Sequence, residues 1–368
     1  MAARQAAMRE ARLRAVRDFS DEVKGRFESA SYWEYERFLG NGTYGMTVLL
    51  REKDQLAAAD PKRIALKLAK RGNRAGTLQL RNELKFLKIL RGAMHIVNMV
   101  ASCDDLNSVN GGDVASRSVF GPLQALMQGP AVALEYLDQG DLVTLKIDID
   151  NFQQRMPNRV LWSLFTCLIR ACIGMAYPLE GPEGTPSVLE TVRTDGTGLR
   201  GIVHQDLAAR NIVLGSEDGI EEHGIGYLFK LIDFGNTREY DLPRGPRDNL
   251  YDCAKLIYQL MDYEPIQNYP AVWKDHLTRA GNIVPMEADY SDDPFPRVDF
   301  DLRDLVARCL YVDAAQRPTL QEALDAGLAA VVRDPETFPD PDDETDEAIR
   351  DFFQRFIHDV PDDMRMRG

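Results

Sequence analysis

The most informative stretch of this chain is His204-Gln205-Asp206-Leu207-Ala208-Ala209-Arg210-Asn211, and Asp233-Phe234-Gly235 follows it. The first motif sets an aspartate and an asparagine five positions apart, and the second has an aspartate before Phe-Gly. The apolar pair Leu231-Ile232 directly precedes Asp233, which indicates that this carboxylate stands at the end of a buried strand. A carboxylate there is costly unless a cation or hydrogen-bond donors pair with it. The competing interpretation is an aspartate in an exposed turn, which needs no partner.

Four further motifs have ordinary interpretations when each is taken alone. The segment Gly40–Gly45 is a G-x-G-x-x-G between two strand-like runs, and such a pattern is often only a hairpin turn. Lys67 ends the apolar run 64–67, where an edge lysine commonly extends its amine to solvent. Glu83 lies 16 residues later in a helical pattern, where a carboxylate is usually solvated. The stretch Leu134-Glu135-Tyr136-Leu137 is typical of a strand end followed by a turn.

Taken in this order, the motifs resemble those of the protein kinase family, and the late pair Arg317-Pro318 also fits its pattern. The resemblance covers residues 34 to 332. It implies an α+β fold of the two-lobed, protein-kinase-like kind, in which a small β-rich N-lobe carries one key helix and a larger C-lobe is mainly helical. The expected units are a helical extension at 1–33, the N-lobe at 34–136, the C-lobe at 137–332 and an acidic tail with a short amphipathic helix at 333–368.

The resemblance implies a kinase that uses ATP and Mg²⁺. Asp206 would accept the proton of the substrate hydroxyl, and Arg210 would contact the phosphates. Asn211 and Asp233 would ligate Mg²⁺, because oxygen ligands from the protein and the nucleotide suit this hard cation. Lys67 completes the expected catalytic set, since it would pair with the α- and β-phosphates.

The same resemblance implies a nucleotide site between the glycine segment and the stretch 134–137. Phosphates need backbone N–H donors at close range, and glycine lets the chain approach without a Cβ atom. Leu134 would be the gatekeeper beside the adenine, and Glu83 would hold the lysine amine. Glu135 and Leu137 would face the adenine through their backbone, and Asp141 could reach the ribose. The other residues expected at the nucleotide site are Gly40, Gly42, Gly45, Lys67 and Glu83.

The chain departs from the family pattern within its catalytic loop. Gln205 replaces an arginine that commonly receives a phosphate of the activation segment, so we expect activity that does not depend on phosphorylation there. The segment after Gly235 contains two hydroxyl-bearing residues, Thr237 and Tyr240. The run Ala208-Ala209-Arg210 resembles the tyrosine-kinase version of the loop, which leaves specificity for Ser/Thr or Tyr open.

The segment after Gly235 is also much shorter than an ordinary activation segment. It contains no Ala-Pro-Glu motif, and only 13 residues lead from Gly235 to Asp248. Either Asp248 or Asn249 is expected to anchor the central helix of the C-lobe. Arg317 normally pairs with the missing glutamate, and Glu239 is the replacement that we consider.

These features favour an ATP-dependent kinase whose acceptor is a hydroxyl on a protein. A small-molecule kinase of the aminoglycoside or choline phosphotransferase type is a second interpretation, because of the short segment and the run Tyr251–Leu256. A pseudokinase scaffold that binds nucleotide without turnover is the third. The retained residues that argue against this third interpretation are Lys67, Asp206, Asn211 and Asp233.

The composition is that of an ordinary globular chain, with 44% hydrophobic and 28% charged residues among 368. The net charge of −14 argues against general nucleic-acid binding. Five scattered cysteines without a C-x-x-C pair predict a reducing, intracellular and cytoplasmic location. Inspection finds no apolar run of about 18 residues, so we expect no membrane span. The sequence does not predict an oligomeric state.

Hydrophobic periodicity predicts strands up to residue 136 and mostly helices afterwards. Three polar or glycine-rich insertions, at 104–129, 179–201 and 216–226, are expected to be loops. In the tail, 339–344 is expected to be an extended, solvated linker, because charge and proline oppose packing. A helix then follows, and we favour its docking on the chain's own C-lobe over a partner-binding helix or a plug near the substrate face. Its apolar stripe consists of Ile349, Phe352, Phe353, Phe356 and Val360.

Overall fold

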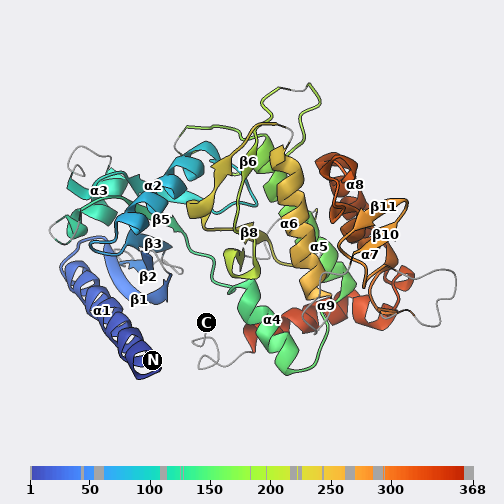
Figure 1. The fold of residues 1–368 in the computed structure, drawn as a ribbon. Coiled ribbons are helices and arrows are strands. Elements are labelled where there is room, and N and C mark those ends of the chain that lie inside the picture. The colour runs from blue at the N-terminus through green and yellow to red at the C-terminus, as the bar shows by residue number, and fades with distance from the viewer. Residues whose placement is uncertain are drawn as a thin grey trace.

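A five-stranded antiparallel sheet forms the N-terminal part of the computed structural model (Figure 1). Its strand order is β1-β2-β3-β5-β4, and apolar residues alternate along β2 and β3 to bury one face. The strands run over Trp33–Asn41 (β1), Gly45–Glu52 (β2), Arg63–Ala69 (β3), Met99–Cys103 (β4) and Ala131–Glu135 (β5). The structure describes residues 2–42, 45–53, 62–107, 114–124, 126, 128–182, 184–195, 197–215, 222, 226–242, 244–261, 270–284, 293 and 295–359.

The N-terminal helix α1 (Ala2–Glu28) is part of the same core as the sheet. Phe19, Val23 and Phe27 are buried and lie four residues apart, so they share one face of the helix. This face packs with the strands in one hydrophobic cluster. The expected helical character of residues 1–33 is confirmed by α1, and the structure adds that this helix belongs to the core.

The insertion at 104–129 contains a helix, α3 (Val114–Phe120), so the prediction of a polar loop there is wrong. Val119, Phe120 and Leu123 are buried in the cluster that α1 shares with the sheet. Glycine and aspartate dominate the flanks of this segment, which concealed a helix of seven residues. A helix this short depends on the tertiary burial of its apolar side chains rather than on its own propensity.

The remainder of the chain is mainly helical and lies beside the sheet (Figure 1). Among the described residues, one helix, α5, is long and apolar enough to span a membrane, which inspection of the sequence did not predict. Its apolar window is 94% buried inside the protein, as expected for a central core helix. The helices are α2 (Arg74–Ile89), α4 (Leu142–Asn151), α5 (Asn158–Ala176), α6 (Arg244–Leu260), α7 (Phe300–Cys309), α8 (Leu320–Val331) and α9 (Asp346–Phe353). The short strand pairs are β6 (Ile202–Val203) with β9 (Arg238–Glu239), β7 (Ile212–Leu214) with β8 (Phe229–Leu231), and β10 (Ala271–Trp273) with β11 (His276–Thr278).

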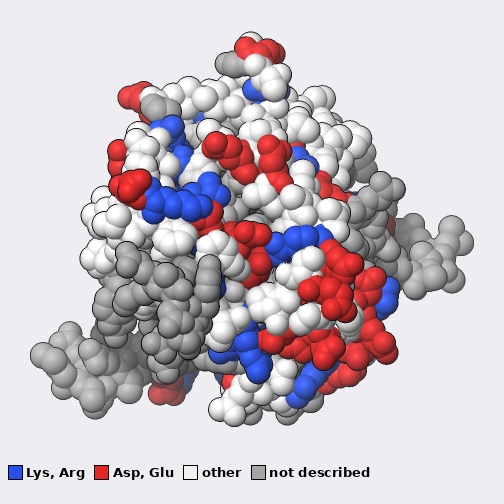
Figure 2. All heavy atoms as spheres, turned by 90° about the vertical axis from the view of Figure 1, so that its right-hand side faces the viewer, with Lys and Arg blue, Asp and Glu red and all other residues white. Residues whose placement is uncertain are grey.

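Acidic side chains gather in several clusters on the face of the molecule drawn in Figure 2, with basic side chains between them. The five cysteines are all buried and free. The Sγ atoms of Cys172 and Cys253 lie 3.3 Å apart, as neighbouring thiols. Both features fit the composition of an acidic chain with reduced cysteines.

The acidic tail folds against the helical part, and the expectation of an extended, solvated linker at 339–344 is wrong, because Pro341–Glu344 forms a 3-10 helix whose last residue is buried. Glu344 is 1% exposed, and its carboxylate accepts hydrogen bonds from the backbone N–H groups of Asn158 at 2.7 Å and Arg159 at 2.9 Å. These residues begin α5, whose first N–H groups have no partner within the helix. The carboxylate therefore caps the central helix and complements its dipole from a distant part of the sequence.

Helix α9 follows this cap and confirms the predicted docking of the tail on the chain's own helical part. Phe353 packs edge-on against Tyr227, with ring centroids 4.8 Å apart. Val360, the last residue of the predicted stripe, lies outside the described residues. The buried members of the stripe are Ile349, Phe352, Phe353 and Phe356.

Replacing Phe353 by alanine should lower the free energy of unfolding by about 3–5 kcal/mol, because it removes a buried aromatic side chain and leaves a cavity. Urea denaturation followed by circular dichroism measures this loss. Arg350→Ala changes an exposed residue of the same helix and should shift stability by at most about 0.5 kcal/mol. Equal stability of the two variants would contradict the docking of α9.

The insertion at 179–201 is irregular, as predicted, and is fastened to the loop that follows α2. The backbone N–H of Val188 donates to the carbonyl oxygen of Gly92 at 2.9 Å. A second contact joins the buried His95 imidazole to the Glu190 carboxylate of the insertion, with Nδ1 and Oε2 2.7 Å apart. Burial alone would lower the pKa of His95, but the hydrogen bonds that its ring makes to the Cys167 and Glu190 side chains, together with the charge of Glu190, raise it to about 9.

This buried pair predicts a loss of stability in alkaline solution. The pKa of His95 is about 9 in the folded protein against 6.5 in the unfolded chain, so its contribution is complete below pH 6.5 and disappears as the pH rises through 9. That difference corresponds to roughly 3 kcal/mol. Urea denaturation at pH 6.5, 8 and 9.5 should show the decline in the wild type and a smaller decline in Glu190→Gln, because the Cys167 contact remains. The exposed carboxylate of Glu180 lies in the same insertion, and Glu180→Gln should keep the decline.

Candidate active site

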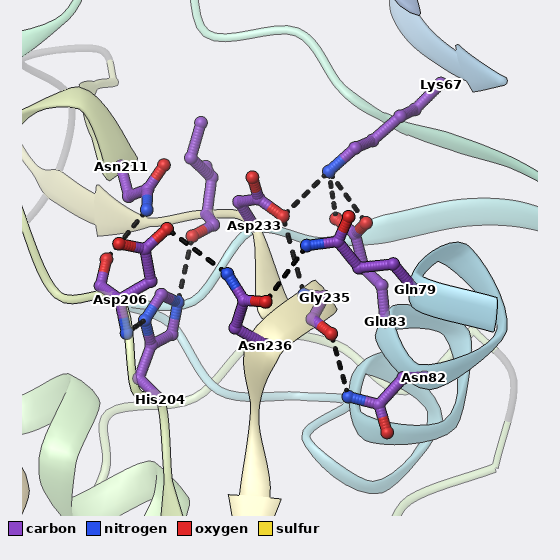
Figure 3. A network of polar contacts seen from close by, with 11 residues as sticks. Lys67, Gln79, Asn82, Glu83, His204, Asp206, Asn211, Asp233, Gly235 and Asn236 are labelled. Atoms are coloured by element: carbon purple, nitrogen blue, oxygen red, sulfur yellow. Dashed lines mark hydrogen bonds and ion pairs between the residues drawn. The ribbon is translucent and has the colours of Figure 1, made fainter. Parts of the chain in front are cut away.

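Strand β3, helix α2 and the end of β8 bring three predicted site residues into one ion-pair cluster (Figure 3). Lys67 Nζ lies 2.7 Å from Glu83 Oε2 and 2.9 Å from Asp233 Oδ1. Glu83 is 1% exposed and stands in the middle of the buried face of α2. The order of the motifs along the chain predicted that Lys67 and Glu83 would pair, and the structure adds Asp233 to this pair.

The charges of this cluster are mutually stabilised in spite of burial. Burial disfavours the ammonium form of Lys67, but the carboxylates of Glu83 and Asp233 outweigh it and raise the pKa of the lysine above its ordinary value. Burial alone would raise the pKa of Asp233, but the Lys67 charge lowers it below the usual range. Lys67 is therefore charged and Asp233 ionised at neutral pH. The prediction that a carboxylate at this strand end needs a charged partner is confirmed.

Asp233 also adopts a backbone conformation that directs the chain away from the strand. Its φ angle is 65°, in the left-handed region, which aspartate tolerates better than most residues. Its carboxylate accepts a hydrogen bond from the N–H of Gly235 at 3.4 Å. Phe234 is fully buried and packs edge-on against the His204 ring, with centroids 4.8 Å apart. The Phe234 side chain thus joins the Asp233 motif to the catalytic loop.

The predicted catalytic loop is organised around a neutral histidine. Burial lowers the pKa of His204 to about 4, so its imidazole is neutral at pH 7. Nε2–H donates to the carbonyl oxygen of Ile232 at 3.0 Å, and Nδ1 accepts from the backbone N–H of Asp206 at 3.3 Å. Asn211 Nδ2 donates to the carbonyl oxygen of Asp206 at 2.7 Å. These contacts hold the backbone on both sides of the Asp206 side chain.

The Asp206 carboxylate is partly exposed and has two polar neighbours. One oxygen forms an ion pair with the guanidinium of Arg210, whose side chain is 61% exposed. The other accepts from Asn236 Nδ2 at 3.4 Å. The structure therefore places Asp206 and Asn211 within one short loop beside Asp233 (Figure 3), and Arg210 of the same loop pairs with Asp206.

Asn249 is the residue that anchors α6 to the catalytic loop. Its side chain is 1% exposed; Oδ1 accepts from the N–H of His204 at 3.1 Å and Nδ2 donates to the carbonyl oxygen of Ile202 at 2.7 Å. An asparagine can do both because its carboxamide carries a donor and an acceptor. Of the two candidates that the sequence left open, Asp248 does not have this position.

Asp248 instead lies near Arg317. Its Oδ1 is 3.6 Å from Arg317 NH1, and the guanidinium also stacks over the Tyr251 ring at 4.5 Å from the centroid. The suggestion that Glu239 takes this role is wrong, because Glu239 pairs with Arg200 at 2.8 Å. Asp248, one helical turn into α6, thus lies beside Arg317, where the Ala-Pro-Glu glutamate would be expected.

The glycine segment connects β1 and β2, as the hairpin prediction requires. Gly40 and Gly42 have open space where a side chain would stand, which leaves room for a phosphate group. Gly45 differs, since a Cβ atom there would lie 2.7 Å from the carbonyl oxygen of Leu68, so this glycine is required for close packing of β2 on β3. The intervening residues 43–44 lie outside the described residues.

The residues predicted to face the adenine and ribose follow β5. Glu135 ends this strand; its side chain pairs with Lys230 Nζ at 2.6 Å, and its backbone N–H donates to the carbonyl oxygen of Asn98 at 2.9 Å. Leu137 is half-buried two residues later. Asp141 begins α4, and one of its carboxylate oxygens caps that helix by accepting from Thr144 N–H at 2.8 Å. A ribose contact would therefore use the other oxygen.

The donor set at the end of β8 fits a magnesium ion bound together with a nucleotide. Asn211 uses its amide nitrogen on the Asp206 backbone, which turns its oxygen to the opposite side. One carboxylate oxygen of Asp233 accepts a hydrogen bond from Lys67 Nζ. Among the described residues, no group of three or more His, Cys, Asp or Glu side chains forms a cation site of its own. One carboxylate and one amide oxygen match the way Mg²⁺ is held when phosphates supply further ligands.

Three amide residues of the site were missed by the sequence reasoning. Asn82 donates to the carbonyl oxygens of Gly235 and Thr237, and Gln79 Nε2 donates to Asn236 Oδ1 at 3.1 Å. The available signal was the spacing along α2, because Asn82 and Glu83 lie three and four residues after Gln79 and residues at these spacings share a helix face. Asn236 directly follows the Asp-Phe-Gly motif and had no such signal.

Comparison with known proteins finds distant similarity to protein kinases, and no family model matches the chain. The chain is 24% identical over 225 residues to the G2-specific protein kinase nim-1 of Neurospora crassa, a match that covers 54% of this chain and 24% of that protein. It is 22% identical over 303 residues to calcium-dependent protein kinase 34 of Arabidopsis thaliana, which covers 78% of this chain and 48% of the relative. The chain thus spans at most about half the length of these relatives. The matches support a relationship to the protein kinase superfamily.

Proposed function

We propose that the chain is an ATP-dependent kinase that transfers the γ-phosphate to a hydroxyl group on a protein. The observation that carries this proposal is the closed cluster of Lys67, Glu83 and Asp233 beside Asp206. In protein kinases this lysine–glutamate pair and the metal-binding aspartate must both be in place for phosphoryl transfer. The names of the distant relatives, which are protein kinases, support the acceptor class.

The chemistry divides among residues of the chain. Asp206 would take the proton of the acceptor hydroxyl. The hydroxyl oxygen would then bond to the γ-phosphorus while the bond from that phosphorus to the β,γ-bridging oxygen breaks. Lys67 would hold the α- and β-phosphates, since its charge is fixed by two carboxylates. Asn211 and Asp233 would hold Mg²⁺, which neutralises the charge of the phosphates when it is bound. Arg210 is exposed enough to turn from Asp206 to a phosphate.

We also propose the two-lobed architecture, with the sheet and α2 in an N-lobe at 34–136 and the later helices in a C-lobe at 137–332. The extension at 1–33 and the tail at 333–368 pack on these lobes in the proposal. Five free cysteines support an intracellular, cytoplasmic location.

A small-molecule acceptor is the second candidate, and the observation that favours it is the short segment between Gly235 and α6. This segment passes through β9 and reaches Arg244, the first residue of the helix, with little chain to form a peptide-docking surface. A metabolite needs less surface than a peptide.

Incubation of the purified chain with Mg²⁺ and γ-labelled ATP over a panel of proteins, peptides and hydroxylated metabolites tests the proposal. We expect label on Ser, Thr or Tyr of a protein, and none when EDTA removes the magnesium. Label on an aminoglycoside or on choline would establish the second candidate. Nucleotide binding without any transfer across the panel would overturn both and leave a nucleotide-binding scaffold.

A further inference from the structure

Helix α2 presents three polar residues on one face toward the segment that follows Asp233. Gln79, Asn82 and Glu83 have the spacing i, i+3 and i+4, which places them on one side of a helix. Glu83 holds the amine of Lys67, while the other two point toward residues 235–237 (Figure 3). The helix that positions the lysine therefore also contacts the start of the short segment.

The Asn82 carboxamide binds two backbone carbonyl groups at once. Its Nδ2 atom donates to the carbonyl oxygen of Gly235 at 3.0 Å and to that of Thr237 at 2.9 Å. Both hydrogens of the amide are thus used on one turn of chain. The approach is close, because a Cβ atom on Gly235 would lie 2.6 Å from the Gln79 side chain. Glycine at this position is what lets the segment lie against α2.

A second amide chain leads from the helix to the catalytic carboxylate. Gln79 Nε2 donates to Asn236 Oδ1 at 3.1 Å, and Asn236 Nδ2 donates to Asp206 Oδ2 at 3.4 Å. Because the Gln79 donor fixes which end of the Asn236 carboxamide is the acceptor, the other end must present its N–H to Asp206. This chain of hydrogen bonds thus favours one orientation of the Asp206 side chain.

We propose that Asn82, Gln79 and Asn236 form an amide latch, a set of positioning residues that holds the segment after Asp233 against α2 and orients Asp206 without any phosphorylated residue. This inference rests on the proposed kinase function for its effect on turnover. The latch makes the placement of Lys67, Asp233 and Asp206 depend on one helix, since that helix contacts all three directly or through one residue.

The two hydroxyls of the segment support a latch of this kind. Thr237 is 1% exposed, so a kinase has no access to its hydroxyl in this conformation. Tyr240 donates its hydroxyl to Gln205 Oε1 at 3.3 Å, which uses the residue that replaces the usual phosphate-binding arginine. The neutral amide of Gln205 therefore stands at the position where a charged arginine would otherwise bind a phosphate. Hydrogen bonds between neutral groups are also less sensitive to salt than ion pairs with a phosphate.

The variants Asn82→Asp and Asn236→Ala test the latch. Asn82→Asp keeps the size of the side chain but replaces its donor by a carboxylate oxygen, which repels both carbonyl groups. Gln321→Ala is the control, because it removes one side-chain amide from the exposed face of α8. Steady-state kinetics with Mg-ATP gives kcat and KM, hydrogen–deuterium exchange reports the backbone at 233–240, and thermal unfolding reports stability.

We expect Asn82→Asp to lower kcat by about tenfold or more, with KM for ATP within about threefold, because the loss of these part-buried hydrogen bonds costs about a factor of ten. Exchange at 233–240 should accelerate in this variant. Asn236→Ala should lower kcat and leave exchange at 235–237 unchanged, since the Asn82 contacts remain. The control should match the wild type in both measurements.

Wild-type kcat in Asn82→Asp, or unchanged exchange at 233–240, would overturn the latch. If the wild type itself transfers no phosphate, the proposed function fails, and the exchange measurement still decides whether Asn82 holds the segment. If Asn82→Asp does not fold, Asn236→Ala decides, since kcat at the wild-type level in that variant would refute the orienting role. Treatment of the wild type with phosphatase should leave kcat unchanged, and a loss of activity would contradict the proposal.

Discussion

Replacement of Asp206 by alanine lowers phosphotransfer by roughly 10²–10⁴, the usual contribution of a general base or orienting group. Binding of Mg-ATP remains within a few-fold of the wild type, because the predicted metal ligands and Lys67 are unchanged. The physical reason is the position of the carboxylate, which is partly exposed and oriented by contacts from Arg210 and Asn236. Single-turnover transfer and nucleotide titration measure the two quantities separately.

The isosteric variant Asp206→Asn separates proton acceptance from orientation. It retains one acceptor oxygen and the side-chain shape, yet cannot take a proton at neutral pH, so we expect a loss similar to that of alanine. Asp241→Ala is the matched control, because Asp241 is exposed in the same short segment and should keep wild-type turnover. Transfer within a few-fold of the wild type in both Asp206 variants would remove this residue from the catalytic role.

The second large effect concerns Asp233. Asp233→Asn should lower kcat/KM by at least about 10²-fold, because the metal's stabilisation of developing charge is worth several kcal/mol and each 1.4 kcal/mol is a factor of ten. The variant also removes one of the two carboxylates that neutralise Lys67. Activity should therefore require a higher Mg²⁺ concentration than in the wild type.

Magnesium titrations of activity at saturating ATP measure this shift for the wild type and the variant. Asp195→Asn is the control, since Asp195 is exposed in the insertion at 179–201 and should give wild-type curves. Thermal unfolding with and without Mg-ATP gives a second, activity-independent readout, because a ligand stabilises the state that binds it. Turnover and magnesium dependence like those of the wild type would refute the metal assignment.

The sequence was sufficient for those parts of the site that depend on order along the chain. Lys67 and Glu83 pair as predicted, since a strand and the next helix can bring residues at this spacing together. Asp206 and Asn211 are held within one loop, where local geometry dominates. Strands β1 to β5 end by residue 135 and the chain is mostly helical afterwards, as hydrophobic periodicity predicted.

The parts that could not be predicted depend on contacts between distant segments. Asn249 and Asp248 are adjacent, and only the direction of each side chain from α6 decides which meets the catalytic loop. Glu344 looks solvated in an acidic tail, yet it caps a helix that begins 186 positions earlier. Asn82 belongs to the same group, because a polar residue on a helix reveals nothing of the carbonyl groups that approach it.

Helix α1 affects how this protein can be divided. A cut at residue 33, where the kinase motifs begin, would remove Phe19, Val23 and Phe27 from a core that they share with the sheet. The exposed apolar face left on the strands would favour aggregation during expression. Fragments meant to isolate the sheet and the site should therefore include helix α1. A sequence search restricted to residues 34–332 would omit this helix and its part of the core.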